Sequence, residues 1–407
     1  MRSALCLALA ALAGCVVPKR AGFEDIERMA GERGARVHWN QGGETDAKVA
    51  RHVGELLGSE LDVTRATEIA LLNNPRLQAT YERLGVAQAD VVQAGLLRNP
   101  SIGAHVGFPI GMGLLEVNGS IVGEFLDLFL IPLKKKFANA EFRRVKLEVA
   151  EAVLELVAEV ESAFFMAQAT AQIVEMRRMV HEAESVAAEL AVQQHEAGTL
   201  SDLDLTARQS LYVQAKLDVA RSEGELYRDR ERLSRLLGVW GRRTDWKLAR
   251  GLPELPAEEA PLDHLESFAV AHRLDLQAAR EEMLTASAAL QVTKGTRVIG
   301  GLEAGVDAHR DPDGPFTIGP SIRLELPIFD QKQAAVARLR SHLRSAEKRR
   351  DALAIDVRSQ VREARSRVAV ARAAAEFYRS TVVPLGRSFQ LTFFARSLAR
   401  KSLCDFW

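Results

Sequence analysis

The spacing of apolar residues along the chain predicts long helices. From Leu61 to about Gly95 apolar residues recur every three or four positions, as on one face of an amphipathic helix that an Asn-Pro pair at 74–75 interrupts. A second stretch begins at Pro132 and continues without further Pro or Gly to about Ala197. As a helix it would be roughly 100 Å long. Because an ordinary globular domain does not accommodate such a helix, the pattern predicts an elongated protein.

Between these helices the spacing changes to strict alternation. Residues 101–108 and 116–125 alternate apolar residues with polar residues or glycine, and a Gly-Met-Gly sequence between them suits a hairpin connection. The alternation returns at 302–309 and 317–326. Each stretch has the length of a membrane barrel strand, with one apolar face and one polar or charged face. The sequence therefore predicts four strands, two in each half of the chain.

The first long helix ends in a predicted helix-to-helix turn. Gly198 breaks the helix, Ser201 can cap the next one, and that helix returns to about Leu237, just before Gly238. The two helices therefore form a long antiparallel hairpin.

The second half of the chain repeats the order of elements in the first. A linker rich in Pro and Glu occupies 251–261, and a shift of about 199 positions then places Leu77 on Leu276. After the second pair of strands, Pro327 opens another long helix. The chain is therefore predicted to be an internal two-fold repeat.

The N-terminus has the features of a bacterial export signal. A basic start and a short apolar run precede Leu-Ala-Gly-Cys, which resembles a lipobox. We therefore expect a signal peptide at 1–14, lipidation of Cys15 and a lipidated tether over 15–60. Val16 instead of Asp after the cysteine favours the outer membrane, by resemblance to sorted lipoproteins. The alternative is an ordinary signal peptide with an incidental cysteine.

The composition and the motifs argue against several classes of function. The formal net charge is zero, which gives no electrostatic reason to bind nucleic acid. Cys6 leaves with the signal, and Cys404 lies in the unusual tail. No pair of cysteines therefore remains to form a disulfide in the exported protein. The nine histidines are scattered without metal-ligand spacing, and no phosphate-binding, dinucleotide or nucleophile motif occurs. We therefore expect no catalytic residue, no cofactor and no metal site.

Four strands cannot close a barrel, so the pattern also predicts an oligomer. In lipid an open sheet edge leaves backbone groups unpaired, and cyclic symmetry lets several chains close one sheet. Three chains would supply about twelve strands around a water-filled lumen. The charged residues predicted to line it are Glu116, Glu124, Glu303, Asp307, Arg323 and Glu325. The alternative is a small soluble sheet with one wet face.

Several segments, taken in order, resemble the TolC family of outer-membrane efflux proteins. They are 61–79, 94–101, 125–132, 197–205 and 326–330. The resemblance implies a mainly α fold with membrane β-strands: long antiparallel helical hairpins, four β-strands per protomer, a two-fold internal repeat and a trimeric α/β-barrel tunnel. It also implies passive export by a homotrimer in outer-membrane lipid, which works with a periplasmic adaptor protein and an inner-membrane pump.

The resemblance assigns a role to the hairpin turn as well. In this family the turns at the periplasmic tip meet the adaptor, so the expected docking residues are Gly198, Leu200, Ser201 and Asp202. The alternative is that these residues only cap the two helices and contact no partner.

The resemblance divides the chain into a first repeat at 61–250, the linker at 251–261 and a second repeat at 262–390 that lacks its return helix. Residues 391–407 contain no Gly-Ser-Asp turn and are interpreted as an aberrant tail that follows a frameshift or premature stop. Two other functions stay open. The chain could be a periplasmic coiled-coil lipoprotein with a structural or adaptor role, or a non-functional truncated channel relic. The sequence does not choose between small molecules and metal ions as the cargo.

Overall fold

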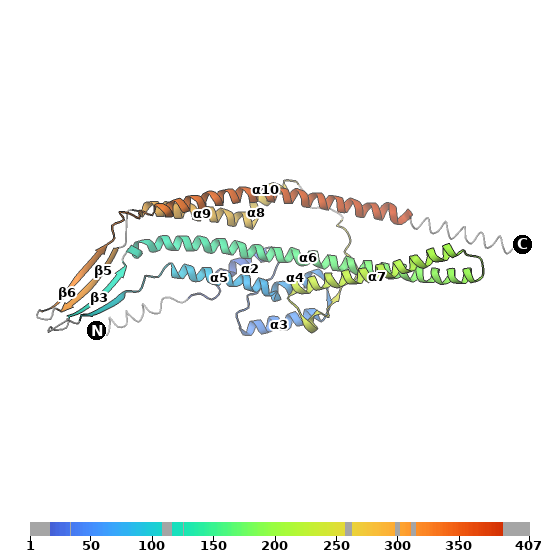
Figure 1. Cartoon of the computed structure of the whole chain (residues 1–407), viewed down its shortest axis with the longest axis horizontal. Helices are drawn as coiled ribbons and strands as arrows, with labels where there is room; N and C mark the ends of the chain where they lie inside the picture. Colours follow the sequence, from blue (N-terminus) through green and yellow to red (C-terminus); the bar gives the residue numbers. More distant parts are fainter. Residues whose placement is uncertain are drawn as a thin grey trace.

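The structure of the protein, a computed structural model, is elongated, with a β-sheet at one end and the tip of a helical hairpin at the other (Figure 1). It describes residues 17–32, 34–107, 116–124, 126–256, 263–297, 302–310 and 315–385. The predicted signal peptide, Cys15, the Gly-Met-Gly connection and the predicted tail lie outside the described residues. Within that part of the chain, no helix combines enough length and apolar character to cross a membrane.

The longest element is α6, which covers Leu126–Glu196 and contains 71 residues. Pro132 lies inside α6, so the predicted start of the helix at this proline is wrong. A proline removes one backbone hydrogen bond from a helix, but the residues on both sides can still adopt helical geometry. The return helix α7, Asp202–Leu237, ends where the sequence predicted, because Gly238 adopts the left-handed conformation that closes a helix.

The end of α7 is tied to the break between two earlier helices, α4 (Val63–Asn73) and α5 (Pro75–Gln93). Asn73 Nδ2 donates to the carbonyl oxygen of Gly238 at 2.9 Å. Asn74 is buried, its Nδ2 donates to a carbonyl oxygen of the last turn of α7 at 2.8 Å, and its Oδ1 caps α5. The Asn-Pro sequence that interrupts the helical pattern thus fixes where α7 stops.

Gly238→Ala should lower the free energy of unfolding by about 1–3 kcal/mol. The residue has φ of +69°, and an added Cβ would lie 2.6 Å from the carbonyl oxygen of Asn73. The matched control is Gly224→Ala inside α7, where no atom lies within 4 Å of the added Cβ. That change should raise the free energy of unfolding by about 0.5–1 kcal/mol. Chemical denaturation of both variants checks this, and equal effects would contradict it.

The segment before α4 contains two helices that the apolar spacing does not indicate, α2 (Phe23–Gly31) and α3 (Glu44–Leu57). Phe23 is 1% exposed and packs edge-on against Tyr81 of α5, with 5.1 Å between ring centroids. Lys146 of α6 forms an ion pair with Asp25 of α2 at 2.6 Å. The main apolar core therefore lies where α2, α4 and α5 meet α6, and the N-terminal segment is part of it.

Four strands form one antiparallel sheet in the order β2-β3-β5-β6. Their bounds are Ser101–Gly107, Glu116–Glu124, Leu302–Arg310 and Phe316–Leu324. The predicted alternating segments match these strands to within two residues at each end. Because β3 pairs with β5, the two halves of the chain meet in this sheet. A separate parallel pair joins β1 (Glu60–Leu61) to β4 (Lys247–Leu248).

The second half contains α8 (Leu265–His272), α9 (Leu274–Gly295) and the long α10 (Gln333–Phe377). The prediction that Pro327 opens the last long helix is wrong, because α10 begins six residues later. Lys332 adopts a left-handed conformation with φ of 58°, and its backbone N–H donates to Asp330 Oδ1 at 2.8 Å. Such bonds from a side chain to nearby backbone compete with helix formation and delay the start of α10.

Glu151 on α6 lies among other acidic groups where α9 packs along α6. Burial raises the pKa of Glu151 to about 7, and the negative charges of Asp275 and Glu155 act in the same direction. The positive charge of Arg273 opposes them. Near neutral pH the folded protein therefore holds a proton on Glu151 more tightly than the unfolded chain does.

The free energy of unfolding should therefore depend on pH through Glu151. The unfolded carboxyl loses its proton near 4.5 and the folded one near 7, so stability falls as pH rises through this window. Glu151→Gln should remove that part of the pH dependence. Denaturation between pH 4.5 and 8 measures it, with Glu161→Gln on an exposed face of α6 as the control. An unchanged profile in Glu151→Gln would contradict the assignment.

Candidate functional site

One face of the four-stranded sheet is apolar and exposed. The register places Ile102, Ile121 and Val306 in one row across β2, β3 and β5, and their exposed fractions are 80%, 53% and 49%. On the outer strand β6, Ile318 and Ile322 are exposed on the same face at 65% and 76%. Monomeric soluble proteins rarely expose a contiguous apolar surface of this kind. We call this surface the apolar sheet face.

The opposite face carries most of the residues predicted to line a lumen. The register places Glu124, Glu303 and Arg323 in one row across β3, β5 and β6. Arg323 forms an ion pair with Glu303 at 2.8 Å. Asp307 lies on the same face of β5, opposite Ser120. These four predicted residues line one hollow of about 700 Å³, and we call this surface the polar sheet face.

The other two predicted residues lie at the ends of strands. Glu116 begins β3, opposite Gly107, and Glu325 follows the last residue of β6. Arg98, which is not among the residues predicted to line a lumen, forms an ion pair with Glu124 at 2.6 Å. Arg98 precedes the alternating segment, so no local spacing could have assigned it to this face.

Both outer strands of the sheet have an open edge. In the described part of the chain β2 pairs only with β3, and β6 pairs only with β5. Each outer strand therefore has one row of N–H and C=O groups without a partner strand. An exposed apolar face and two open edges leave this sheet incomplete as a single chain.

The turn between α6 and α7 is built by helix caps. Gly198 has φ of +73°, and its N–H donates to the carbonyl oxygen of His195 at 2.8 Å. Ser201 Oγ accepts from the backbone N–H of Asp204 at 3.2 Å. The predicted capping role of Ser201 is therefore confirmed, and the turn is an ordered structure rather than a loose loop.

A histidine outside the predicted docking residues, His195, holds this turn. His195 Nδ1 lies 3.0 Å from the carbonyl oxygen of Leu200, and Nε2 lies 3.3 Å from a carboxylate oxygen of Asp202. The two contacts join the last turn of α6 to the first residue of α7 across the turn.

The surface of the turn contains one further residue that was missed. The Asp202 side chain is 95% exposed, and Leu203, the next residue, is 79% exposed. Helical spacing alone treats a leucine at this position as a core residue. Its exposed fraction in the structure shows that Leu203 points outward beside the predicted docking residues.

The described residues contain no cluster of three or more His, Cys, Asp or Glu side chains that could hold a metal.

Comparison with known proteins defines the class of fold. No established family profile matches the chain. The CmeC outer-membrane channel of Campylobacter jejuni superposes with a TM-score of 0.63 at 13% identity, over 78% of this chain and 74% of CmeC. A structure of CusC, described as forming a transmembrane channel, superposes with a TM-score of 0.59 at 18% identity, over 84% and 83%. The chain therefore has the fold of these outer-membrane channels.

A sequence relative supports the same class. The cobalt-zinc-cadmium resistance protein CzcC of Cupriavidus metallidurans is 25% identical over 341 residues, which cover 80% of this chain and 77% of CzcC. The resemblance to TolC-family outer-membrane efflux proteins is confirmed by these comparisons. The predicted mainly helical fold with a minority of strands is confirmed as well.

Proposed function

We propose that the chain is an outer-membrane channel subunit of a tripartite efflux system, through which small molecules or metal ions leave the cell passively. The observation that carries this proposal is the four-stranded sheet, which has an apolar sheet face, a polar sheet face and two open edges. Lipid can cover the apolar face, and water can fill the space at the charged face. A catalytic role has no comparable support.

The open edges support a trimer. A membrane does not tolerate unpaired backbone groups at a sheet edge, so β2 of one copy must pair with β6 of the next. Three copies supply about twelve strands, enough to enclose an aqueous lumen. The α6–α7 hairpin, on the order of 100 Å from the sheet to its turn, would carry the tunnel into the periplasm.

The turn of this hairpin is the proposed contact with a periplasmic adaptor protein, which in turn meets an inner-membrane pump. Gly198 and Ser201 fix the turn, while Asp202 and Leu203 are the exposed groups that a partner can touch. Lipids on Cys15 would anchor the N-terminus to the outer membrane.

The charge of the proposed lumen favours cationic cargo. Five of the six charged residues predicted to line it are acidic, and with Arg98 added the set stays net negative, five acidic against two basic residues. A net negative lumen concentrates cations. CzcC is named for resistance to cobalt, zinc and cadmium. Divalent metal ions are therefore the first cargo to test, with small organic cations as the second.

The proposal is tested by the assembly of the full chain produced with its own leader in a Gram-negative host. We expect outer-membrane fractionation and a detergent-resistant trimer on unheated gels. A soluble periplasmic monomer after removal of the leader would instead support the coiled-coil lipoprotein.

Asp202→Arg should disable export without preventing assembly. The change reverses the charge at the tip of the turn and removes the contact between Asp202 and His195. We expect a drop of about fivefold or more in export-dependent metal resistance, with a normal amount of trimer, because a charge reversal in a contact costs about 1 kcal/mol or more. The matched control is Glu189→Arg, the same charge change on an exposed site of α6. Equal loss of resistance in both variants would contradict docking through the turn.

A further inference from the structure

A row of residues that contains two histidines crosses the polar sheet face. The register places His105 of β2 opposite Asn118 of β3, and it places Asn118 opposite His309 of β5. Thr317 of β6 lies opposite His309 and completes the row. We call these four residues the histidine row. None of them is among the charged residues predicted to line a lumen, so the proposed function has given them no role so far.

The histidine row lies near the end of the sheet that is farthest from the helices. Helix α6 begins at Leu126, directly after β3, and the helices extend from that end of the sheet (Figure 1). The stretch of β3 from Asn118 to Glu124 measures roughly 20 Å along the strand. In the proposed barrel the histidine row would therefore surround the outer mouth of the lumen, away from the periplasmic helices.

The charges of the polar sheet face are paired near the helices and unpaired farther out. In the row nearest the helices, Glu124 is paired with Arg98 at 2.6 Å and Glu303 is paired with Arg323 at 2.8 Å. Two acidic and two basic groups contribute no net charge there. Asp307, in the row next to the histidine row, takes part in no ion pair within the described chain. The net charge of the outer part therefore depends on Asp307 and on the histidines.

The other charged positions of the sheet lie at the ends of strands. Glu116 is the first residue of β3, two positions before the histidine row on the same face. Arg310 ends β5 but lies opposite Val117, in a row of the other face. Glu325 follows β6 at the end nearest the helices. Two acidic positions, Glu116 and Asp307, thus flank the histidine row, and within the described strands no Lys or Arg shares that part of the face.

Both imidazoles border the same space as the Asp307 carboxylate. His105 is exposed, His309 is partly exposed, and His309 Nδ1 forms a hydrogen bond with Oδ1 of Asn118. The two histidines, Asn118 and Asp307 line one hollow of about 390 Å³. As a residue type, histidine gains its positive charge between about pH 8 and 5, whereas Asp and Glu keep their negative charge down to about pH 4. Acid therefore adds two positive charges beside two acidic positions.

We propose that His105 and His309 determine the ion specificity of the outer mouth, which favours cations at neutral pH and loses that preference in acid. This inference rests on the proposed channel function and adds the residues that set which ions pass. Three copies would bring two histidines each to the mouth. Rings of charged side chains set the selectivity of pores, so neutralising this ring removes the attraction for cations.

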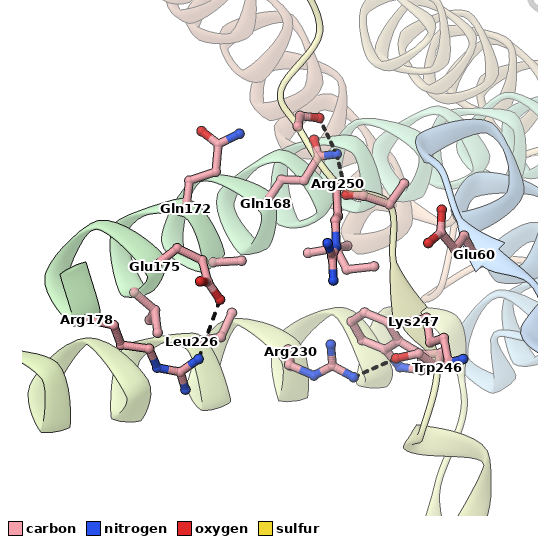
Figure 2. Close-up of a pocket in the computed structure, with 15 residues that line it drawn as sticks. Glu60, Gln168, Gln172, Glu175, Arg178, Leu226, Arg230, Trp246, Lys247 and Arg250 are labelled. Carbon is pink, nitrogen blue, oxygen red and sulfur yellow. Dashed lines mark hydrogen bonds and ion pairs between the residues drawn. The ribbon is translucent and has the colours of Figure 1, made fainter. Parts of the chain in front are cut away.

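Two other features of the chain are relevant to a response to acid. A hollow of about 600 Å³ between α6 and α7 is lined by several charged residues (Figure 2). Among the described residues that line it there is no histidine, and Arg and ordinary carboxylates keep their charge between pH 7.5 and 5.5. Glu151 differs, because its pKa is raised to about 7, but it lies where α9 packs along α6. Glu151→Gln is therefore the matched control.

The test measures the reversal potential of the purified full chain in a planar lipid bilayer under a KCl gradient, at pH 7.5 and at pH 5.5. We expect the permeability ratio of K⁺ to Cl⁻ to fall about threefold or more on acidification. The double variant His105→Gln/His309→Gln should keep the ratio of pH 7.5 at both values. His105→Gln alone, at an exposed position, should lose part of the response. Glu151→Gln should respond like the unaltered protein, and unheated gels check that each variant forms the trimer.

The inference is overturned if the unaltered protein has the same permeability ratio at both pH values, or if the double variant keeps the full response. In either case the channel function stands, because conductance with a preference for cations is still observed at pH 7.5. A folded trimer without any conductance would instead contradict the channel function itself, and this inference with it.

Discussion

Val306→Arg should abolish the outer-membrane trimer. Val306 is the middle residue of the nine in β5, it is 49% exposed, and it lies in the central row of the apolar sheet face. An arginine at the centre of a lipid-facing strand costs about 2–4 kcal/mol per chain, and a trimer contains three copies of it. We expect almost no protein in the outer-membrane fraction and no detergent-resistant trimer on unheated gels.

Asp307→Arg is the matched control, since adjacent residues of a strand point to opposite faces. Asp307 lies on the polar sheet face beside Ser120. The same side chain introduced there would meet water, so assembly should be retained while ion selectivity changes. If Val306→Arg and Asp307→Arg assemble equally well, lipid does not cover the apolar sheet face.

Phe23→Ala should lower the free energy of unfolding by about 3–5 kcal/mol, the usual cost of removing a buried aromatic ring. Phe23 is 1% exposed and lies between Trp39 and Tyr81, with ring centroids 5.7 and 5.1 Å away. The cavity left behind would lie where the N-terminal segment meets α5 and α6. Urea denaturation followed by tryptophan fluorescence, to which the buried Trp39 contributes, measures the effect.

Phe377→Ala is the control for this change. Phe377 is the last residue of α10 and is 57% exposed, so its removal should change the free energy of unfolding by less than about 0.5 kcal/mol. A small effect of Phe23→Ala, close to that of Phe377→Ala, would mean that the N-terminal segment is only a tether.

The strands and long helices could be predicted because their signals are local. Alternation of side chains defines each strand, and Gly198 and Ser201 mark a turn by their own backbone preferences. The pairing of β3 with β5 could not be predicted. It joins Ile121 to Val306, residues far apart in the sequence, and no local spacing records which strand lies beside another. The ion pair of Arg98 with Glu124 was missed for the same reason.

The two prolines show the limit of local signals most clearly. Pro132 and Pro327 were both predicted to open a long helix. Pro132 instead lies within α6, and α10 begins at Gln333, after Pro327. A proline restricts the backbone of its neighbours, but it does not decide whether a helix begins before it or after it. The start of α10 is instead set by side-chain hydrogen bonds, such as the one that Asp330 accepts from the backbone N–H of Lys332.

The most direct test of the channel is single-channel conductance of the purified full chain in a planar lipid bilayer. The proposed function predicts stable conductance steps, a preference for cations, and loss of that preference in Asp307→Arg, which reverses a charge on the polar sheet face. Absence of any conductance from a protein that is folded and trimeric would contradict the central claim that the polar sheet face lines an open aqueous path.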